Sequence, residues 1–411
     1  MRTNPPLSTT AARIRPPVFA DLQARIDALA GKGLELVPLQ IGDTWIAPPA
    51  AARRALAAID PDDATLHRYG PTAGVAALRA AVAKNVKRHG LDVDAEAEVL
   101  VGNGGTHALF CAARAVLDAG DEVLMASPYW PLAPGIFTSC GATPIDVPLT
   151  QRLYADPTLD AGAIFAAAIT PRTKALYVIS PNNPDGKVLS LAQLESIAKV
   201  ARDHDLWVFS DEVYADIVFG EPHVSIASLA GMRDRTIVLH SMSKSHALAG
   251  SRVGFVVAPP PVVMSGRRVS THSAFNVSVA MQRAAMAALE EEDFPRIACA
   301  QYREARGLTA AALASHAHRV HAHLAEGATY LFLDFAPAFA AMGPDRAGPK
   351  PLLTLLERAV DRGVLLAPGD AFGASYDTCA RLCYTAVPAP KVVAGVERLL
   401  DALDAMEQGR P

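Results

Sequence analysis

The stretch Ser241-Met242-Ser243-Lys244-Ser245 places a lysine between hydroxyl side chains, and Arg252 follows it one loop later. A lysine amine can attack a carbonyl carbon and form a covalent intermediate, while hydroxyls and an arginine suit a phosphate group. Considered alone, such a stretch is more commonly a solvated loop. Its chemistry therefore depends on what the rest of the fold brings to it.

A glycine-rich stretch, Val101-Gly102-Asn103-Gly104-Gly105-Thr106-His107, offers a phosphate cup. The free amides at the start of a helix and the Thr106 hydroxyl would bind the anion. A dinucleotide-binding fingerprint fits poorly, because His107 stands where that fingerprint needs a small residue. A tight turn with a capped helix remains the alternative.

Two further polar stretches also follow apolar segments. Asn183 lies in Ser180-Pro181-Asn182-Asn183-Pro184-Asp185-Gly186, and Asp211 precedes Tyr214 in Ser210-Asp211-Glu212-Val213-Tyr214. An acid at the end of a buried strand and a phenol close behind it can face one ligand. The alternatives are a proline-rich turn for the first stretch and a helix cap by Asp211 for the second.

All four stretches follow short apolar segments that predict strands. The expected strands are 98–101, 122–126, 143–147, 175–180, 206–210, 236–240 and 253–257, and the expected helices include 19–30, 75–89, 107–118 and 191–204. Strands that are apolar on both faces and alternate with helices predict an α/β fold with a mostly parallel sheet. Ligands of such sheets bind beyond the carboxyl ends of the strands, where the four stretches lie.

The pattern changes near residue 290. A long helix is expected at 294–316 and another at 351–362, with strands at 320–323, 330–334, 364–367 and 381–384 and a loop at 343–350. This α+β arrangement predicts a second, smaller domain.

The composition narrows the class of protein. The 411 residues are 51% apolar and carry a net charge of −4, which gives ample material for buried cores and no basic surface for nucleic acid. The cysteines form no CxxC pair and no cluster with histidines, so we expect reduced thiols and no metal site. We find no apolar signal segment and no apolar run long enough to span a membrane, which favours a cytoplasmic location.

In their order along the chain, these residues resemble the class I/II aminotransferase family, the fold-type-I enzymes that depend on pyridoxal 5′-phosphate (PLP) and are similar to aspartate aminotransferase. The resemblance covers residues 35–400 and rests on Tyr69-Gly70, Gly105-Thr106, Pro128-Tyr129-Trp130, Asn183-Pro184-x-Gly186, Asp211-x-x-Tyr214, Ser241-x-Ser243-Lys244, Arg252-Val253-Gly254 and Arg381. It implies a large domain with a mostly parallel seven-stranded sheet and a smaller α+β domain. We expect an arm and part of the small domain at 1–45, the large PLP-binding domain at 46–290 and the small C-terminal domain at 291–411.

The resemblance also implies a role for each residue toward the cofactor. Lys244 would bind PLP as a Schiff base and, once freed, move the Cα proton of the substrate. Asp211 would pair with the pyridine nitrogen, while Tyr214 and Asn183 would bond the phenolic O3′. The phosphate would be held by Gly105, Thr106, Ser241, Ser243 and Arg252.

Other positions are expected around the ring and the substrate. Trp130 would stack on the pyridine ring, with Tyr129 as the neighbouring alternative. Arg381 would bind the α-carboxylate of the substrate, helped by the backbone at Gly42. Tyr69 would reach the phosphate in the site of a second subunit, which implies a homodimer with shared active sites.

Some positions depart from the usual family pattern. His246 stands where an aromatic residue is common, and a buried, satisfied histidine is expected there. His107 lies near the phosphate cup, although helix packing explains it equally well. The resemblance assigns the loop Gly42-Asp43-Thr44-Trp45 to the substrate, and Trp45 could narrow or floor the side-chain pocket there. Some relatives that prefer acidic substrates have a lysine where this chain has Thr106, so an apolar or aromatic donor is favoured here.

The leading hypothesis is a PLP-dependent aminotransferase that moves the amino group of an L-amino acid to a 2-oxo acid, commonly 2-oxoglutarate. β-Eliminating lyases and ring-forming synthases share the same residues and form the alternative. A ligand-sensing regulator of the same fold would need a DNA-binding extension of roughly 60–70 residues, which we do not expect here.

Overall fold

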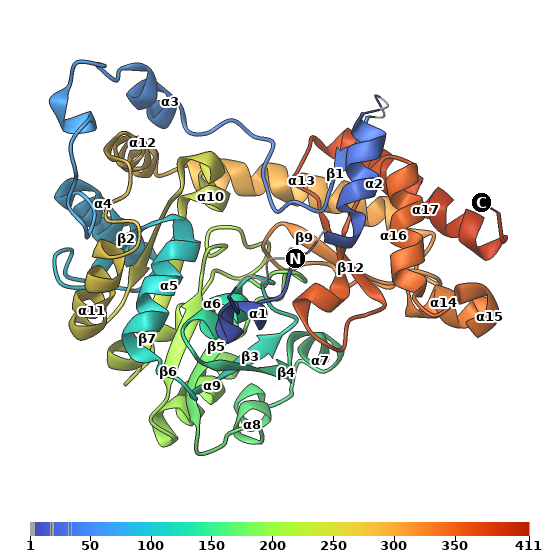
Figure 1. Ribbon diagram of the computed structural model, residues 1–411, viewed down its shortest axis with the longest axis horizontal. Helices are drawn as coiled ribbons and strands as arrows, with labels where there is room; N and C mark the ends of the chain where they lie inside the picture. The colour runs from blue at the N-terminus through green and yellow to red at the C-terminus, as the bar shows by residue number, and fades with distance from the viewer. Residues whose placement is uncertain (1–4, 17, 19, 32, 34, 411) are drawn as a thin grey trace.

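The computed structural model describes residues 5–16, 18, 20–31, 33 and 35–410. Its largest element is a seven-stranded sheet with the order β2-β8-β7-β6-β5-β3-β4 (Figure 1). The strands are β2 (Val99–Asn103), β3 (Glu122–Ser127), β4 (Thr143–Pro148), β5 (Thr173–Ile179), β6 (Trp207–Asp211), β7 (Thr236–Ser241) and β8 (Val253–Val257). Within this sheet β8 is antiparallel to both its neighbours, β2 and β7. The predicted mostly parallel α/β sheet is therefore confirmed.

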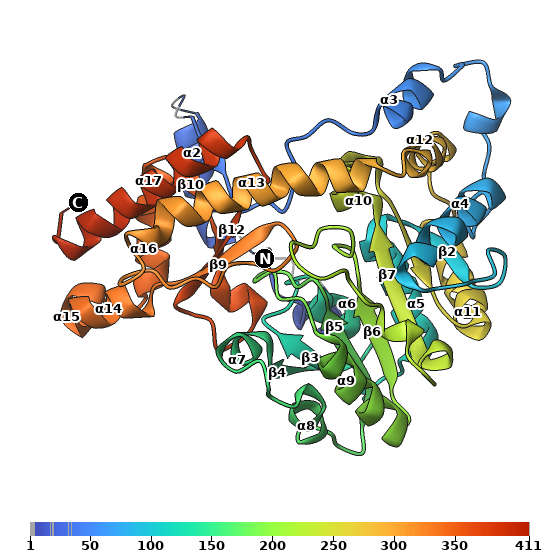
Figure 2. The same ribbon diagram turned by 180° about the vertical axis from the view of Figure 1, so that it is seen from behind.

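Both faces of this sheet are buried, because successive strand residues point to opposite sides and both sets are apolar. On β3, Val123 and Met125 join one apolar cluster, while Leu124 and Ala126 join another on the opposite face. The helices that pack in the first cluster are α5 (Gly104–Val116), α6 (Ala133–Ser139) and α11 (Pro260–Thr271). Those in the second are α7 (Thr150–Ala155), α8 (Ala161–Ala166) and α9 (Leu191–Asp203). Figure 2 shows α8 and α9 on the side of the sheet that Figure 1 hides.

The edge of the sheet at β2 and β8 has its own apolar cluster. There α4 (Ala76–Val86) and α12 (Val279–Glu290) pack against Val99, Val101 and Phe255. The segment that leads into this part carries α3 (Ala50–Ala57), which lies against α12.

A second group of elements joins the C-terminal part of the chain to residues near the N-terminus. β9 (Tyr330–Asp334), β12 (Cys379–Cys383) and β11 (Ala367–Pro368) form an antiparallel sheet, and β1 (Val37–Pro38) pairs in parallel with β10 (Val364–Leu365). Its helices are α2 (Ala20–Ala30), α13 (Phe294–Ala314), α14 (Ala336–Met342), α15 (Pro344–Ala347), α16 (Pro351–Asp361) and α17 (Ala389–Glu407). α13 reaches from α10 (Met242–Ser245) to α17, so it links the two groups (Figure 1).

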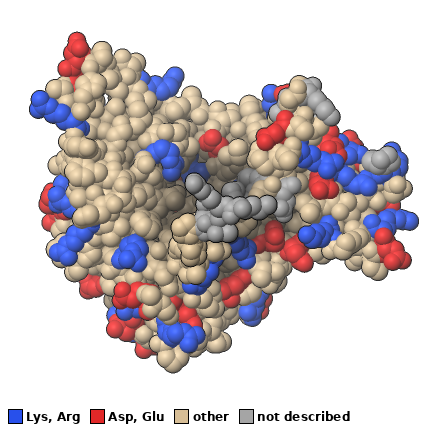
Figure 3. All heavy atoms as spheres, viewed as in Figure 1, with Lys and Arg blue, Asp and Glu red and all other residues tan. Residues whose placement is uncertain are grey.

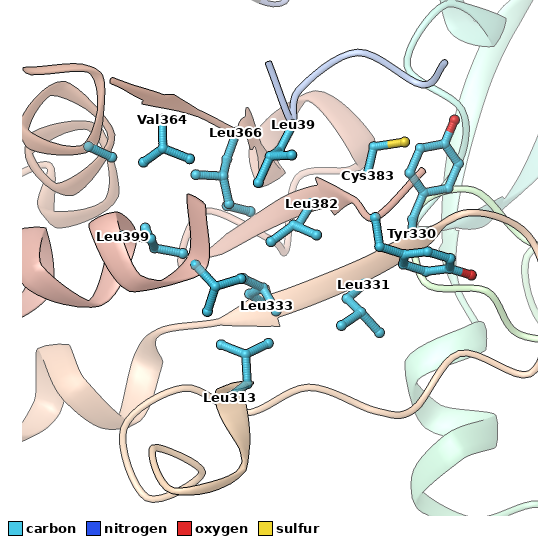
Figure 4. Packing of buried hydrophobic residues seen from close by; sticks show 14 of the residues in the cluster. Leu39, Leu313, Tyr330, Leu331, Leu333, Val364, Leu366, Leu382, Cys383 and Leu399 are labelled. Atoms are coloured by element: carbon cyan, nitrogen blue, oxygen red, sulfur yellow. The ribbon is translucent and has the colours of Figure 1, made fainter. Parts of the chain in front are cut away.

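The core of this second group is aliphatic along most of its length. Leu333, Leu382 and Leu399 pack together, and Tyr330 lies in the same cluster at the end of β9 that faces the large sheet (Figure 4). The group therefore brings one polar aromatic side chain to the boundary with the seven-stranded sheet.

Shorter helical turns complete the fold. They are α1 (Thr9–Ala12), η1 (Ala64–Leu66), η2 (Lys87–His89), η3 (Ile226–Ser228), η4 (Arg233–Arg235), η5 (Ala249–Ser251) and η6 (Gly369–Phe372). The predicted helix 75–89 divides into α4 and η2, and the predicted helix 19–30 is described as α2 from Ala20, since residue 19 lies outside the described residues.

Two sequence predictions in the second group are wrong. The predicted strand 320–323 makes only an isolated bridge between His321 and Asp334, because no further partner continues it. The predicted loop 343–350 contains the helix α15, since Pro344 stands at its first position, where a missing amide costs nothing.

The pairing of β1 with β10 supports the proposal that residues 1–45 include part of the small domain, next to a large domain at 46–290 and a small domain at 291–411. Among the described residues, no helix is both long enough and apolar enough to cross a membrane.

Candidate active site

A cavity of about 330 Å³ lies where the carboxyl ends of the central strands face the second group of elements. The molecule is hollowed near the middle of the face shown in Figure 3. Most of the predicted site residues line this cavity, namely Gly42, Gly105, Thr106, Trp130, Asn183, Asp211, Tyr214, Ser241, Ser243, Lys244, Arg252 and Arg381. Residues far apart in the sequence thus meet at one sheet edge, as expected for an α/β fold.

The predicted phosphate cup is built by close backbone approach. β2 ends at Asn103 and α5 begins at Gly104, so the free amides of the first helical turn lie at the sheet edge. A side chain at Gly254 would collide with the Gly105 amide, and one at Gly104 would collide with the Arg252 guanidinium. Glycine is therefore required for Arg252 and the helix start to lie side by side.

Serine hydroxyls complete this cup. Ser241 ends β7 and caps α10, where its Oγ accepts a hydrogen bond from the Ser243 amide at 3.1 Å. The Ser241 and Ser243 hydroxyls lie 2.9 Å apart. Amides, hydroxyls and one guanidinium thus converge on a volume that suits a phosphate group.

Asp211 is the buried acid of the site. Its side chain is 3% exposed, and its carboxylate accepts hydrogen bonds from the Tyr177 hydroxyl at 2.9 Å and the Val213 amide at 3.3 Å. Burial raises the pKa of Asp211 to about 6. Both hydrogen-bond partners are neutral, so a cation bound beside this carboxylate would stabilise its charge.

Lys244 lies on α10 and faces the loop that contains Gly42. Its Nζ donates a hydrogen bond to the carbonyl oxygen of Gly42. Tyr214, on the segment after β6, is fully buried and its hydroxyl lies 2.7 Å from the Tyr330 hydroxyl. Burial raises the pKa of Tyr214 well above its usual value, so the phenol stays protonated.

Arg381 is held on β12 with its guanidinium inside the cavity wall. Its Nη1 donates to Asn183 Oδ1 at 2.9 Å and its Nη2 donates to the Gln40 carbonyl at 2.6 Å. The guanidinium carbon lies 4.4 Å from the ring centre of Tyr330 and 5.0 Å from that of Phe372. The Arg381 Nε is buried and, among the described residues, has no hydrogen-bond partner.

Trp130 and Tyr129, the two residues that could stack on the pyridine ring, differ in their position relative to the cavity. Trp130 lines the cavity. Tyr129 is 6% exposed, packs in the core under α5 and α6, and its amide donates to the Phe372 carbonyl. This geometry favours Trp130 for the stacking role.

Two predicted residues do not line the cavity. Trp45 packs edge-to-face on Tyr302 with 5.8 Å between ring centres, and its part in the side-chain pocket stays a prediction. Tyr69 is 85% exposed and its ring lies 4.8 Å from that of Phe275.

The two histidines lie outside the cavity lining. His246 is 3% exposed, its Nδ1 lies 2.9 Å from the Ser245 hydroxyl, and burial lowers its pKa to about 4. His107 accepts the Asn103 amide on Nδ1 at 3.2 Å, while its Nε2 lies 2.9 Å from the Ser273 hydroxyl. Both are thus structural side chains in this geometry.

Two residues that belong to none of the sequence motifs, Tyr177 and Tyr330, also contact the site. Tyr177 stands on β5, two residues before Ile179, which pairs in register with Asp211 on β6. A tyrosine inside an otherwise apolar buried strand beside an acid-bearing strand was the available signal. Tyr330 had no comparable signal, because its strand belongs to the second group and no local pattern predicts the long-range contact with Tyr214.

These donors fit PLP. Asp211, which has no cationic partner among the described residues, faces the cavity, and the Lys244 amine lines it. The phosphate cup beside Arg252 contains backbone amides and hydroxyl groups. The acid suits a pyridinium, the amine suits an aldehyde and the cup suits a phosphate.

The chain is similar to known proteins over most of its length. The family Aminotransferase class I and II matches residues 35–399. The arginine–pyruvate transaminase of Pseudomonas aeruginosa is 34% identical over 86% of this chain and 87% of its own length. The aspartate/prephenate aminotransferase of Thermus thermophilus is 32% identical over 90% of this chain and 92% of its own length. The structure of a single mutant of Thermus thermophilus aspartate aminotransferase superimposes with a TM-score of 0.84 at 30% identity, covering 98% of this chain and 100% of that chain.

The chain belongs to the class I and II aminotransferase family, whose fold is that of aspartate aminotransferase. The family is PLP-dependent and acts in amino acid metabolism, and the enzyme is an aminotransferase. The predicted family and enzyme class are thus confirmed.

Proposed function

We propose that the enzyme binds PLP on Lys244 and transfers the amino group of an L-amino acid with an apolar or aromatic side chain to a 2-oxo acid. The observation that carries this proposal is the convergence of Lys244, Asp211 and Arg381 on one cavity. When bound, PLP supplies an aldehyde that condenses with amines and a ring that accepts electrons from the substrate Cα.

The residues of the chain divide the remaining tasks. Asp211 would hold a proton on the pyridine nitrogen, because burial raises the pKa of this carboxyl and a cation beside it would stabilise its charged form. Arg381 would bind the α-carboxylate through Nε and the Nη atoms and so fix the direction of the Cα–H bond. Lys244 Nζ would then receive the Cα proton.

The lining of the cavity supports the donor class. Its cations are Lys244, Arg252 and Arg381, each of which already has a task, and its remaining wall includes Val18, Ile41, Leu132, Ala367 and Phe372. An apolar wall favours an apolar or aromatic donor side chain, because a second charge bound there would lose its hydration without a partner. We propose 2-oxoglutarate as the acceptor and compare it with pyruvate, which the name of one relative includes and which brings no second charge to this wall.

The shared-site homodimer is also a proposal. Tyr69 lies off the cavity of its own chain and is almost fully exposed beside Phe275. An exposed pair of aromatic rings next to an otherwise ordered surface is typical of an interface.

The proposal is tested by the absorbance of the purified protein during stepwise addition of single L-amino acids. The visible cofactor band should convert to the amine form with leucine, phenylalanine or tyrosine, and should return with 2-oxoglutarate or pyruvate. Preference for aspartate or arginine would contradict the donor class. Release of ammonia without formation of the amine form would assign a lyase instead.

A further inference from the structure

One side chain contacts both halves of the proposed site. Tyr330 begins β9 and is 1% exposed, and it faces the large sheet from the second group of elements (Figure 4). Its hydroxyl lies 2.7 Å from the Tyr214 hydroxyl, and its ring lies under the Arg381 guanidinium. A side chain at Gly42, whose carbonyl accepts from Lys244, would collide with the same hydroxyl.

The two phenols form a closed pair. Among the described residues, the hydrogen bonds of the Tyr214 and Tyr330 hydroxyls are to each other, and either oxygen can be the acceptor. A pair of hydroxyls shares one hydrogen between its oxygens and leaves the second hydrogen free. Both side chains line the cavity, and when Tyr330 donates, the free hydrogen belongs to Tyr214.

The ring of Tyr330 has a separate contact. The Arg381 guanidinium lies 4.4 Å above it, and Nη1 and Nη2 are already fixed by Asn183 and the Gln40 carbonyl. A cation over an aromatic face in a desolvated place is held electrostatically. The ring therefore limits the movement of the group that would bind the substrate carboxylate.

We propose that Tyr330 is a positioning residue that couples the two halves of the site: its hydroxyl turns the Tyr214 proton toward the cavity, and its ring holds Arg381 in place. The inference rests on the proposed function, in which Tyr214 bonds the O3′ oxygen of PLP. A donated hydrogen bond makes the acceptor hydroxyl a stronger donor, so Tyr330 strengthens the bond from Tyr214 to O3′.

Two substitutions separate the hydroxyl from the ring. Tyr330→Phe removes the hydroxyl and keeps the ring, so the pH midpoint of the visible absorbance of bound cofactor should rise by about half a unit and kcat should fall about fivefold. The KM for the amino donor should stay within about twofold, since Arg381 keeps its support. Tyr330→Leu removes both, and the KM should rise about tenfold in addition.

Tyr384→Phe is the matched control. Tyr384 is fully buried in the same apolar cluster, its hydroxyl donates to the Ala328 carbonyl at 2.7 Å, and it does not line the cavity. Its substitution removes one buried hydrogen bond, so it should lower the thermal midpoint like Tyr330→Phe while leaving the absorbance titration unchanged.

Tyr214→Phe provides the test of coupling. If Tyr330 acts through Tyr214, the variant that carries both substitutions should show the absorbance midpoint of Tyr214→Phe alone. An additive shift in the double variant, an unchanged midpoint in Tyr330→Phe, or an equal shift in Tyr384→Phe would each overturn the inference. Failure of the wild-type protein to bind PLP or convert with an amino donor would instead refute the proposed function, so the two failures are distinguishable.

Discussion

Asp211 shows most clearly how one side chain serves function at the expense of stability. Its carboxylate is buried with neutral partners, and burial raises its pKa to about 6. In an unfolded chain the pKa is about 3.9. The folded protein therefore binds a proton more tightly than the unfolded one, and stability is lost as pH rises from about 4 to 6.

This sign predicts opposite effects of Asp211→Asn on the apoprotein and the holoenzyme. The apoprotein should gain up to about 3 kcal/mol in the free energy of unfolding at pH 7, and little at pH 4, because the buried charge is removed. The holoenzyme should lose most of its turnover, because no carboxylate remains to hold the pyridine proton. Urea denaturation of both apoproteins at the two pH values measures the first effect. A stability difference that does not change with pH would contradict the account.

At the scale of single residues, the sequence predicts types and order but not contacts. Lys244, Asp211 and Arg381 could be named from their motifs, and they line the same cavity. The edge-to-face packing of Trp45 on Tyr302 could not be predicted, since it joins segments far apart in the chain. Tyr330 was missed for the same reason.

At the scale of elements, the phosphate cup depends on two segments that approach through glycine. β8 passes beside the start of α5, and a side chain at Gly254 would collide with the Gly105 amide. Strand ends in the large sheet were predictable because apolar runs end at polar motifs. The strands of the second group were harder to predict. Residues 320–323 form only an isolated bridge, and β10 and β11 are two residues long each.

We therefore predict that Gly254→Ala displaces the start of α5 and weakens PLP binding by a factor between about 5 and about 150, since overpacking costs about 1–3 kcal/mol and 1.4 kcal/mol corresponds to a factor of ten. Titration of the apoprotein with PLP, followed by fluorescence, measures the affinity. Gly250→Ala is the control, because nothing lies within 4 Å of its added carbon. Equal affinities for the two variants would exclude a steric role for Gly254.

At the scale of the whole molecule, the site needs residues from near the N-terminus as well as from the C-terminal part of the chain. β1 pairs with β10, so residues near the N-terminus bring Gln40 and Gly42 to the elements that carry Arg381. The second group of elements thus closes a cavity whose opposite wall belongs to the large sheet. The residue pattern alone predicts two layouts along the chain, whereas the closure by residues near the N-terminus is expected only from the family resemblance.

The proposed homodimer predicts complementation between two defective chains. Lys244→Ala and Tyr69→Ala should each be inactive or nearly so, and their mixture after subunit exchange should recover about a quarter of wild-type activity. Half of the dimers are then mixed, and one of the two sites in each has both residues intact. Activity no greater than the sum of the parents, with exchange verified by mass spectrometry, would show that Tyr69 does not serve a second subunit.

The central claim is that Lys244 holds the cofactor. The most direct test is to reduce the PLP-loaded protein with borohydride, digest it and locate the modified lysine by mass spectrometry. We expect one pyridoxyl group, on the peptide that contains Lys244, and none in Lys244→Ala. A modification on another lysine, or no modification of a protein saturated with PLP, would contradict it.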